Sequence, residues 1–397
     1  MWGIHSRERA SGRVWFDCRM LTDDNSDQAT PDDDASHAAG AIDAADASGG
    51  GRGAGGGGRR FAVDAGGDIA STPLQLEEAA RVAEREGFDG VLVTETRHDP
   101  FVALTLAARA TERVRLSSAI AVAFARNPMN TAMLANDLQL VSDGRFVLGL
   151  GSQVKPHIER RFSMPWSHPA KRMREYVEAV RAIWTSWETG DRLRFEGEFY
   201  SHTLMSPVFS PGPNPHGNPR IALAAVGTLM TETAGAVADG FLSHSFTTPR
   251  YLREVSLPAL ERGRASAGRA GEPVEVSLPA LVAVGRTDAE LDTAITAIKK
   301  QIAFYGSTPA YKGVLELHGW GELHERMHAG SVKGEWDAMT SLVTDEVLAE
   351  FAVVGSPTEV AAQLRERYAG VVQRLSFSTP YPVQADVWPE LLGALNE

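Results

Sequence analysis

The sequence predicts an α/β protein, and within that class a (β/α)8 barrel, from three observations. Short apolar runs alternate with amphipathic helical stretches from residue 59 to the end of the sequence. The apolar runs are continuous rather than alternating with polar residues, which is typical of parallel strands buried on both faces. Eight such strands, nearly all followed by helices, fit into about 340 residues, as in a (β/α)8 barrel with insertions. A doubly wound open sheet is the alternative.

The first 58 residues differ from the rest in composition. They contain a run of aspartates at 32–34, alanine-rich stretches and the string GGGRGAGGGG. Such a segment buries too little apolar surface to offset the conformational entropy that ordering removes. We therefore predict a disordered N-terminal extension over 1–58 and a barrel domain over 59–397.

The first half of the barrel contains four predicted strands, and the helices that follow them begin at recognisable residues. Thr72-Pro73-Leu74-Gln75 is a capping box with proline at the first helical position. Pro100 starts the second helix, and Asn127-Pro128 starts the third. The strands are predicted at 61–64, 90–94, 115–123 and 146–151.

The second half of the barrel continues the alternation but carries extra length. A long helix at 170–187 places its apolar and aromatic residues on one stripe, and a hairpin-like stretch follows at 192–204. The remaining strands are predicted at 221–225, 240–245, 274–284 and 374–378. The helices are predicted at 228–238, 248–267, 287–304 and, after the capping box Ser356–Glu359, up to Gly370. The excess length lies in two insertions, about 188–219 and 306–352.

Charge and cysteine content limit the classes of partner. The formal net charge is −12, and no cluster of Lys and Arg offsets it, which disfavours nucleic acid and anionic membranes as partners. Cys18 is the one cysteine, so no disulfide forms within the chain. No stretch has the length and apolar character of a membrane span or a signal peptide. We predict a soluble, cytoplasmic protein that acts on a small molecule.

Barrels of this kind carry their sites at the carboxyl ends of the strands. His98, which follows the second strand beside Asp99, is a candidate acid/base, or else a loop histidine bonded to its neighbour. Gly149 and Gly151 would let a flat ring approach the backbone, or else serve tight packing at the rim. Gly227 and Thr228 open a helix whose N-terminus suits a phosphate, or else form an ordinary turn.

The segment HERMH suggests a different chemistry. It places His324 and His328 one helical turn apart with Glu325 between them, the pattern by which zinc peptidases hold their metal and general base. A histidine six residues further on, the third ligand of the extended motif, is absent, although Glu346 and Glu350 lie downstream. The motif also fits a solvated helix face. A zinc-dependent hydrolase is therefore kept as an alternative, and the main prediction includes no metal.

Four segments in order resemble the bacterial luciferase-like monooxygenase family, and most of all its branch that uses the deazaflavin coenzyme F420. They are GFDGVLVTETRHDPF, RLSSAIAVAFARNP, SDGRFVLGLGSQVKPHIERRFSMPW and ALAAVGTLMTETAGAVADGF. The resemblance runs from about Arg59 to the end of the chain. It implies a luciferase-like TIM barrel and assembly as a homodimer.

The resemblance also implies a cofactor and a set of residues around it. Coenzyme F420 would exchange a hydride with a small organic substrate that the sequence does not identify, and an FMN-dependent flavin monooxygenase is the alternative. A non-proline cis peptide bond is implied at Ala119-Ile120, against the ring. Gly151-Ser152-Gln153 would line the ring and its ribityl chain, and Gly227 and Thr228 would hold the phosphate.

The sequence departs from this family pattern at the expected proton donor. Relatives that use F420 often have Asp-His directly after the second strand, whereas Glu95-Thr96 stands here and His98-Asp99 follows. We expect His98 or Glu95 to manage the proton that accompanies hydride transfer. A second acid on the loop after the fourth strand is replaced by Gln153 and Val154. Trp166, Trp320 and Phe304 are candidates for lining the substrate pocket or for simple packing.

Overall fold

The parallel sheet closes into a barrel because one strand, β10 (Glu275–Val284), pairs with barrel strands on both of its edges. In the computed structural model, which describes residues 61–66 and 71–397, every pairing between neighbouring barrel strands is parallel. The other strands, in barrel order, are β12 (Arg374–Ser378), β1 (Ala62–Gly66), β2 (Gly90–Val93), β3 (Arg115–Ser118), β5 (Phe146–Gly151), β8 (Arg220–Ala224) and β9 (Gly240–Leu242). The predicted (β/α)8 barrel is confirmed, and the open sheet is wrong. The prediction of disorder for 1–58 lies outside the described residues.

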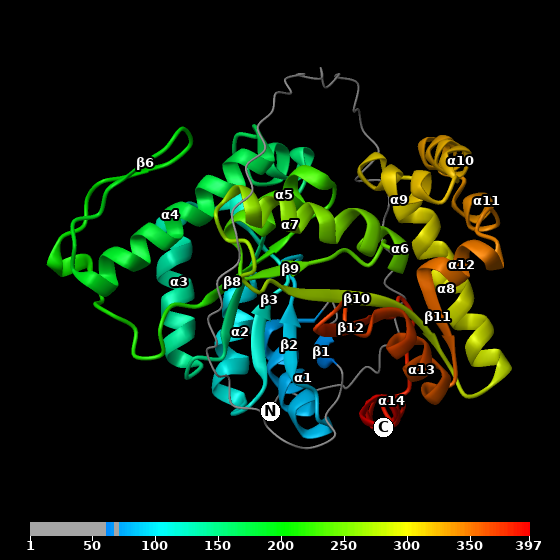
Figure 1. Cartoon of the computed structure of the whole chain (residues 1–397). Coiled ribbons are helices and arrows are strands. Elements are labelled where there is room, and N and C mark those ends of the chain that lie inside the picture. Colours follow the sequence, from blue (N-terminus) through cyan, green and yellow to red (C-terminus); the bar gives the residue numbers. More distant parts are fainter. Residues whose placement is uncertain (1–60, 67–70) are drawn as a thin grey trace, which may run out of the picture. The chain divides into compact units, whose positions relative to one another are not determined.

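Helices surround these strands (Figure 1), with α2, α3 and α4 on the left of the view and α8 on the right. Their starts follow the sequence signals: the Thr72 hydroxyl accepts a hydrogen bond from Gln75 N–H at 3.3 Å, and Asn127 Oδ1 accepts one from Asn130 N–H at 3.0 Å. The helices of the barrel are α1 (Pro73–Glu86), α2 (Pro100–Ala110), α3 (Pro128–Val141), α4 (Pro169–Thr189), α5 (Thr228–Val237), α7 (Leu257–Ser266), α8 (Asp288–Gly306) and α13 (Pro357–Tyr368). A short α6 (Pro249–Tyr251) and a π-helical turn (Leu252–Ser256) lead into α7.

The core lies between the outer face of the strands and the inner face of these helices. The apolar stripe predicted on α4 is buried, and two of its aromatic side chains also pair their polar groups with α3. Trp184 Nε1 donates to Ala132 O at 3.1 Å, and the Tyr176 hydroxyl pairs with the Thr131 hydroxyl at 2.5 Å. Because a buried aromatic with an unpaired N–H or O–H loses stability, these two bonds fix how α4 sits on α3.

Three features differ from the sequence-based prediction. The predicted strand 115–123 is divided into β3 and β4 (Ala121–Val122), with the cis peptide bond Ala119-Ile120 between them, as the family resemblance implied. A strand at β11 (Ala352–Gly355) and a C-terminal helix at α14 (Val387–Asn396) were not predicted. Leu281 of β10 faces Ala352 on one edge and Ser378 on the other, so β11 pairs with β10 beyond the end of β9.

The first insertion forms the predicted hairpin. Two short strands, β6 (Phe195–Glu196) and β7 (Ser201–His202), pair antiparallel. The buried carboxylate of Glu175 on α4 accepts hydrogen bonds from three consecutive backbone N–H groups of the turn, residues 198–200, at 2.6–2.9 Å. A charged acceptor for three otherwise unpaired donors ties the hairpin to α4.

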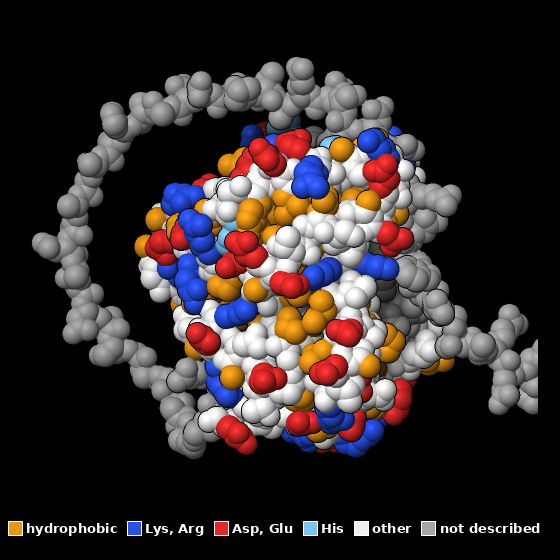
Figure 2. Space-filling model, turned by 90° about the vertical axis from the view of Figure 1, so that its right-hand side faces the viewer, with side chains coloured by type: hydrophobic (Ala, Val, Ile, Leu, Met, Phe, Trp, Pro, Cys, Tyr) orange, Lys and Arg blue, Asp and Glu red, His pale blue; other side chains and the backbone are white. Residues whose placement is uncertain are grey.

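The second insertion is helical and packs on α8. Its elements are a 3₁₀ turn (Pro309–Tyr311), α9 (Lys312–Leu317), α10 (Gly321–Lys333), α11 (Trp336–Thr340) and α12 (Asp345–Phe351). They enclose a second apolar core that includes Phe246, Leu315, Met327 and Phe351. Figure 2 shows the side of the molecule on which these helices lie, where acidic and basic side chains are interspersed. None of the helices within 61–66 and 71–397 is long and apolar enough to cross a membrane.

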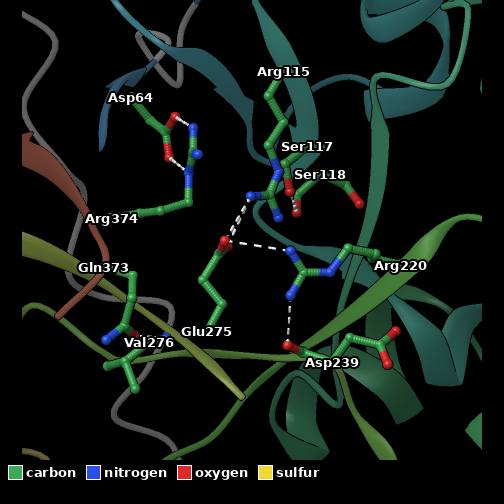
Figure 3. A network of polar contacts seen from close by, with 10 residues as sticks. All are labelled: Asp64, Arg115, Ser117, Ser118, Arg220, Asp239, Glu275, Val276, Gln373 and Arg374. Carbon is green, nitrogen blue, oxygen red and sulfur yellow. Dashed lines mark hydrogen bonds and ion pairs between the residues drawn. The ribbon is translucent and has the colours of Figure 1, made fainter. Parts of the chain in front are cut away.

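A layer of charged side chains fills the barrel interior at the amino ends of the strands (Figure 3). Both carboxylate oxygens of Asp64 bind the guanidinium of Arg374, one of them at 2.8 Å. Glu275 accepts from Arg115 at 2.8 and 2.9 Å and from Arg220 at 3.4 Å. Gly90 makes room for this layer, because a Cβ there would lie 2.2 Å from Asp64 Oδ1. At this end of the barrel, ion pairs therefore join the inner faces of β1, β3, β8, β10 and β12.

We expect Glu275→Gln to destabilise the protein by roughly 3 kcal/mol at pH 7, because it leaves the guanidinium groups of Arg115 and Arg220 without their carboxylate partner in a half-buried site. Burial alone would raise the pKa of Glu275, but the hydrogen bond from Arg115 and the nearby charges of Arg220 and Arg374 lower it below its usual value of 4.5. The carboxylate therefore adds stability above pH 4.5, and this stability is lost as the pH falls through the lowered pKa.

Urea unfolding at pH 7 and at a series of pH values below 4.5 measures this difference. The gap between native and variant should be full at pH 7 and shrink on acidification. Glu254→Gln, which removes an exposed partner of Arg250, serves as control and should leave the unfolding midpoint nearly unchanged. A pH-independent gap would contradict the role assigned to Glu275.

Candidate functional site

The two glycines predicted to admit a flat ring lie on the inner face of β5, where a side chain would not fit. A Cβ on Gly149 would lie 1.8 Å from Ser118 O, and one on Gly151 would lie 2.9 Å from the side chain of Ile120. The Ser118 hydroxyl also donates to Gly149 O at 2.8 Å and accepts Gly149 N–H at 2.9 Å. Gly149 therefore serves close packing of β5 on β3, and Gly151 lets the Ile120 side chain pack directly on the backbone of β5.

The segment around Ala119 and Ile120 is held by the end of β2. The Thr94 hydroxyl donates to Ala119 O at 3.0 Å, and Glu95 N–H donates to Ile120 O at 3.1 Å. Glu95 Oε2 in turn accepts Val122 N–H at 2.7 Å. Ala119 and Ile120 are half-buried, so this segment is fixed by its backbone while its side chains stay partly exposed.

The carboxylate of Glu95 is buried and engaged in an ion pair. Arg126 Nη1 donates to Glu95 Oε2 at 2.6 Å, and Arg126 Nη2 donates to Asp99 Oδ2 at 2.7 Å. Burial alone would lower the pKa of Arg126, but its hydrogen bonds to Glu95 and Asp99 outweigh this and raise the pKa. This arrangement suits Glu95 to positioning the 119–122 segment.

His98 and Asp99 do not form the predicted pair. Asp99 Oδ1 accepts Phe101 N–H at 2.8 Å and caps α2, while Oδ2 binds Arg126. The side chain of His98 is exposed on the same loop. Both carboxylate oxygens of Asp99 are therefore used elsewhere, and any proton transfer by His98 would proceed without Asp99 as its partner.

The loop after β5 turns sharply at the two predicted cofactor residues. Gln153 has a positive φ of 62°, and its Oε1 accepts Val154 N–H at 3.0 Å, while the Ser152 hydroxyl donates to Gln153 O at 3.1 Å. A π-helical turn follows at His157–Arg161, from which Arg161 donates to Thr96 O at 2.5 Å. This bond joins the loop after β5 to the loop after β2 at the carboxyl end of the barrel.

The N-terminus of α5 is free of side-chain caps. Gly227 precedes the helix with φ 78°, in the region that glycine adopts easily, and no side chain caps the described start of α5. Gly227 and Thr228 are both exposed. Helix N–H groups without an intrahelical partner, together with the helix dipole, make this end of α5 suited to an anion such as a phosphate.

Sequence reasoning missed three aromatic residues near the end of β9. His244 follows β9 by two residues, and its ring stacks on Tyr311 with a centroid distance of 4.6 Å and lies edge-on to Tyr305 at 4.6 Å. Burial lowers the pKa of His244 to about 4. The position of His244 after a barrel strand could have been noticed in the sequence. The tyrosines come from α8 and the second insertion, which no local pattern connects to β9.

The HERMH motif has a structural role. His324 Nδ1 pairs with Gly306 O at 2.7 Å and His328 Nδ1 with Ser307 O at 3.0 Å, so both rings cap carbonyls at the C-terminal end of α8. Glu325 is exposed and forms an ion pair with Lys312 at 2.8 Å. Across the described ranges 61–66 and 71–397, no three His, Cys, Asp or Glu residues are placed to hold a metal ion.

The comparisons with known proteins agree with this barrel. The family model described as luciferase-like monooxygenase matches residues 58–374. An uncharacterised protein of Mycobacterium tuberculosis (strain ATCC 25618 / H37Rv) is 55% identical over 317 residues, 80% of this chain and 93% of the relative. A 5,10-methylenetetrahydromethanopterin reductase of Archaeoglobus fulgidus is 30% identical over 309 residues, 75% of this chain and 88% of the relative.

A solved structure shares the fold. The coenzyme F420 dependent tetrahydromethanopterin reductase from Methanopyrus kandleri superposes with a TM-score of 0.69 at 23% identity, covering 84% of this chain and 97% of that chain. The closed parallel barrel places the chain among the α/β-barrel proteins. This chain belongs to the luciferase-like monooxygenase family and is an oxidoreductase of that family.

Glu95→Gln is expected to cost about 1–3 kcal/mol of stability, because the amide is a poorer acceptor for Val122 N–H and leaves Arg126 with Asp99 as its remaining carboxylate partner. Urea unfolding measures the loss. Glu178→Gln, which breaks the exposed pair with Arg174, is the matched control and should change stability little. If Glu95→Gln leaves stability unchanged, the carboxylate does not hold the 119–122 segment.

Proposed function

We propose that the protein transfers a hydride between coenzyme F420 and a small organic substrate at the carboxyl end of its barrel. The observation that carries the proposal is the half-buried platform of Ala119 and Ile120, tethered to the end of β2 and packed on the backbone of Gly151, together with the uncapped N-terminus of α5. A flat ring needs the first feature and a phosphate needs the second. The reductase relative from Archaeoglobus fulgidus supports the proposal at the level of reaction class.

The residues present fit such a coenzyme. Ala119 and Ile120 would contact one face of the ring, and Gly149 allows β5 to approach them. Gly151, Ser152 and Gln153 would line the ring and the ribityl chain. Gly227 and Thr228 would bind the phosphate through backbone N–H groups and the threonine hydroxyl. When bound, the deazaflavin supplies or accepts a hydride, and the protein's task is to orient the substrate and exclude water.

Glu95 and His98, the two residues predicted to carry the proton, lie in different surroundings. Glu95 holds the 119–122 segment through Val122 N–H and Arg126, so we assign it to positioning. His98 is exposed and could exchange protons with solvent. The homodimer implied by the family resemblance stays a prediction, which sedimentation velocity on the full chain would test.

An FMN-dependent monooxygenase is the second candidate function. It is favoured by the description of the matching family as luciferase-like monooxygenase. The same ring and phosphate subsites would serve FMN. The difference lies in the chemistry of the cofactor, because reduced flavin reacts with oxygen whereas the deazaflavin has carbon in place of the reactive nitrogen.

A fluorescence titration of the full chain with coenzyme F420 and, separately, with FMN distinguishes the two candidates. We expect tighter binding of F420. Gly151→Ala should weaken binding by about tenfold, because its Cβ would push the Ile120 side chain toward the ring. Gly393→Ala, where nothing lies within 4 Å of the added Cβ, is the control and should bind like the native chain.

The coenzyme affinities and the zinc content of the sample distinguish the candidate functions. Preference for FMN would favour the monooxygenase. An unchanged affinity in Gly151→Ala would place the ring elsewhere. The zinc content of the same sample tests the hydrolase alternative: binding of neither coenzyme together with one zinc per chain would support a metal site at His324 and His328.

A further inference from the structure

The segment that follows β9, residues 243–248, is polar and yet almost entirely buried. Ser243, Ser245 and Thr247 are 5–7% exposed, and Thr248 is fully buried. The Thr247 hydroxyl is buried and, within the described part of the chain, has no hydrogen-bond partner. Ser245 hydrogen-bonds to Tyr305, and Thr248 bonds His318 and caps α6, so Thr247 is the hydroxyl of this segment that is left over. Because buried polar groups are normally paired, a leftover hydroxyl at the carboxyl end of a barrel strand indicates a place where a ligand could bind.

This segment begins next to Leu242, which lies close to Gly149 on β5. Leu242 Cδ1 lies 3.1 Å from the position that a Cβ of Gly149 would take, so the inner faces of β9 and β5 meet inside the barrel. His244 is two residues beyond Leu242. Successive residues of an extended chain alternate between faces, so His244 shares the inward face one step closer to the carboxyl end.

The hydrogen bonds of His244 define its tautomer. Phe246 N–H donates to His244 Nδ1 at 3.0 Å, so Nδ1 carries no proton in the neutral ring. The proton is then on Nε2, which donates to the Tyr311 hydroxyl oxygen at 3.1 Å. Burial keeps this ring neutral, because it lowers the pKa of His244 to about 4. The imidazole is thus a fixed donor to Tyr311.

This leaves the proton of the Tyr311 hydroxyl available to another acceptor. Tyr311 is half-buried, and burial raises its pKa, so the hydroxyl stays protonated at neutral pH. The rings packed around it, His244, Phe246 and Tyr305, carry no charge at that pH. A half-buried O–H donor among uncharged rings matches a neutral acceptor better than an anion.

We propose that Tyr311, oriented by His244, donates a hydrogen bond and then a proton to the reacting oxygen of a neutral carbonyl substrate, or accepts that proton from the corresponding alcohol in reverse. The proposal rests on the proposed function, because the hydride comes from the reduced deazaflavin. Tyr311 would be a catalytic residue and His244 a positioning residue.

The step balances in atoms and electrons. The hydride leaves a C–H bond of the reduced deazaflavin, which is thereby oxidised, and with its two electrons forms a new C–H bond at the carbonyl carbon, which is reduced as the carbonyl π bond breaks. The carbonyl oxygen takes the proton of Tyr311, whose O–H bond breaks. The resulting phenolate keeps the hydrogen bond from His244 Nε2 and regains a proton from solvent after the product leaves.

The test compares Tyr311→Phe with Tyr251→Phe, which alters a half-buried tyrosine that packs on the same second core from α6. The first readout is the fluorescence titration with F420, which both variants should leave unchanged. The second is the rate at which reduced F420 is consumed in a single turnover with cyclohexanone or benzaldehyde. Tyr311→Phe should slow it on the order of a hundredfold, and Tyr251→Phe should leave it near the native rate.

A readout independent of turnover is the infrared carbonyl band of ¹³C-labelled benzaldehyde bound to the chain. A hydrogen bond from Tyr311 lowers its frequency, and this shift should be absent in Tyr311→Phe and present in Tyr251→Phe. For the positioning role, His244→Gln retains an N–H donor and should recover most of the rate that His244→Leu loses. Thermal unfolding of all four variants identifies any that fail to fold.

The outcomes separate this proposal from the proposed function. If the native chain binds no F420, the proposed function fails. If it binds F420 but neither binds nor reduces the two carbonyl compounds, the substrate class is wrong. If both compounds are reduced and Tyr311→Phe matches Tyr251→Phe in rate and carbonyl frequency, Tyr311 is not the proton donor.

Discussion

The double pairing of β10 is the constraint on which the rest of the structure depends. A parallel sheet with two open edges would leave backbone N–H and C=O groups unpaired, and β10 removes both edges by pairing with β9 and β12. It is also the longest of the described strands. Its C-terminal part lies beyond the end of β9 and pairs with β11. This extension anchors the C-terminal end of the second insertion, whose N-terminal turn carries Tyr311 to His244.

The amino ends of the barrel strands contribute to stability, and their carboxyl ends carry the candidate site. At the amino ends of the strands, charged side chains pair with one another across the interior, and their partners are all within the protein. At the carboxyl ends, glycines, hydroxyls and an uncapped helix leave groups that are suited to a ligand. The candidate site can therefore keep glycines and the buried Thr247 hydroxyl because ion pairs at the opposite end help to hold the strands in register.

The sequence predicted the barrel and most of its elements because their signals are local. Continuous apolar runs, proline after a capping residue and glycine at helix ends depend on neighbours in the chain. Ala352–Gly355 is too short to be separated from the adjacent apolar helix by such signals. The partners of Glu95 and His244 could not be predicted, since Arg126 and Tyr311 lie 31 and 67 residues away. The cis bond at Ala119-Ile120 was predicted only through family resemblance.

The ion pair between Asp64 and Arg374 has a consequence for how the protein is made. The two residues are separated by 310 positions, and β1 and β12 that carry them are neighbours in the closed barrel. During synthesis from the N-terminus, β1 emerges long before its last partner exists. Until β12 leaves the ribosome, one edge of β1 and the carboxylate of Asp64 have no native partner, so this unit completes its fold only when nearly the whole chain has been translated.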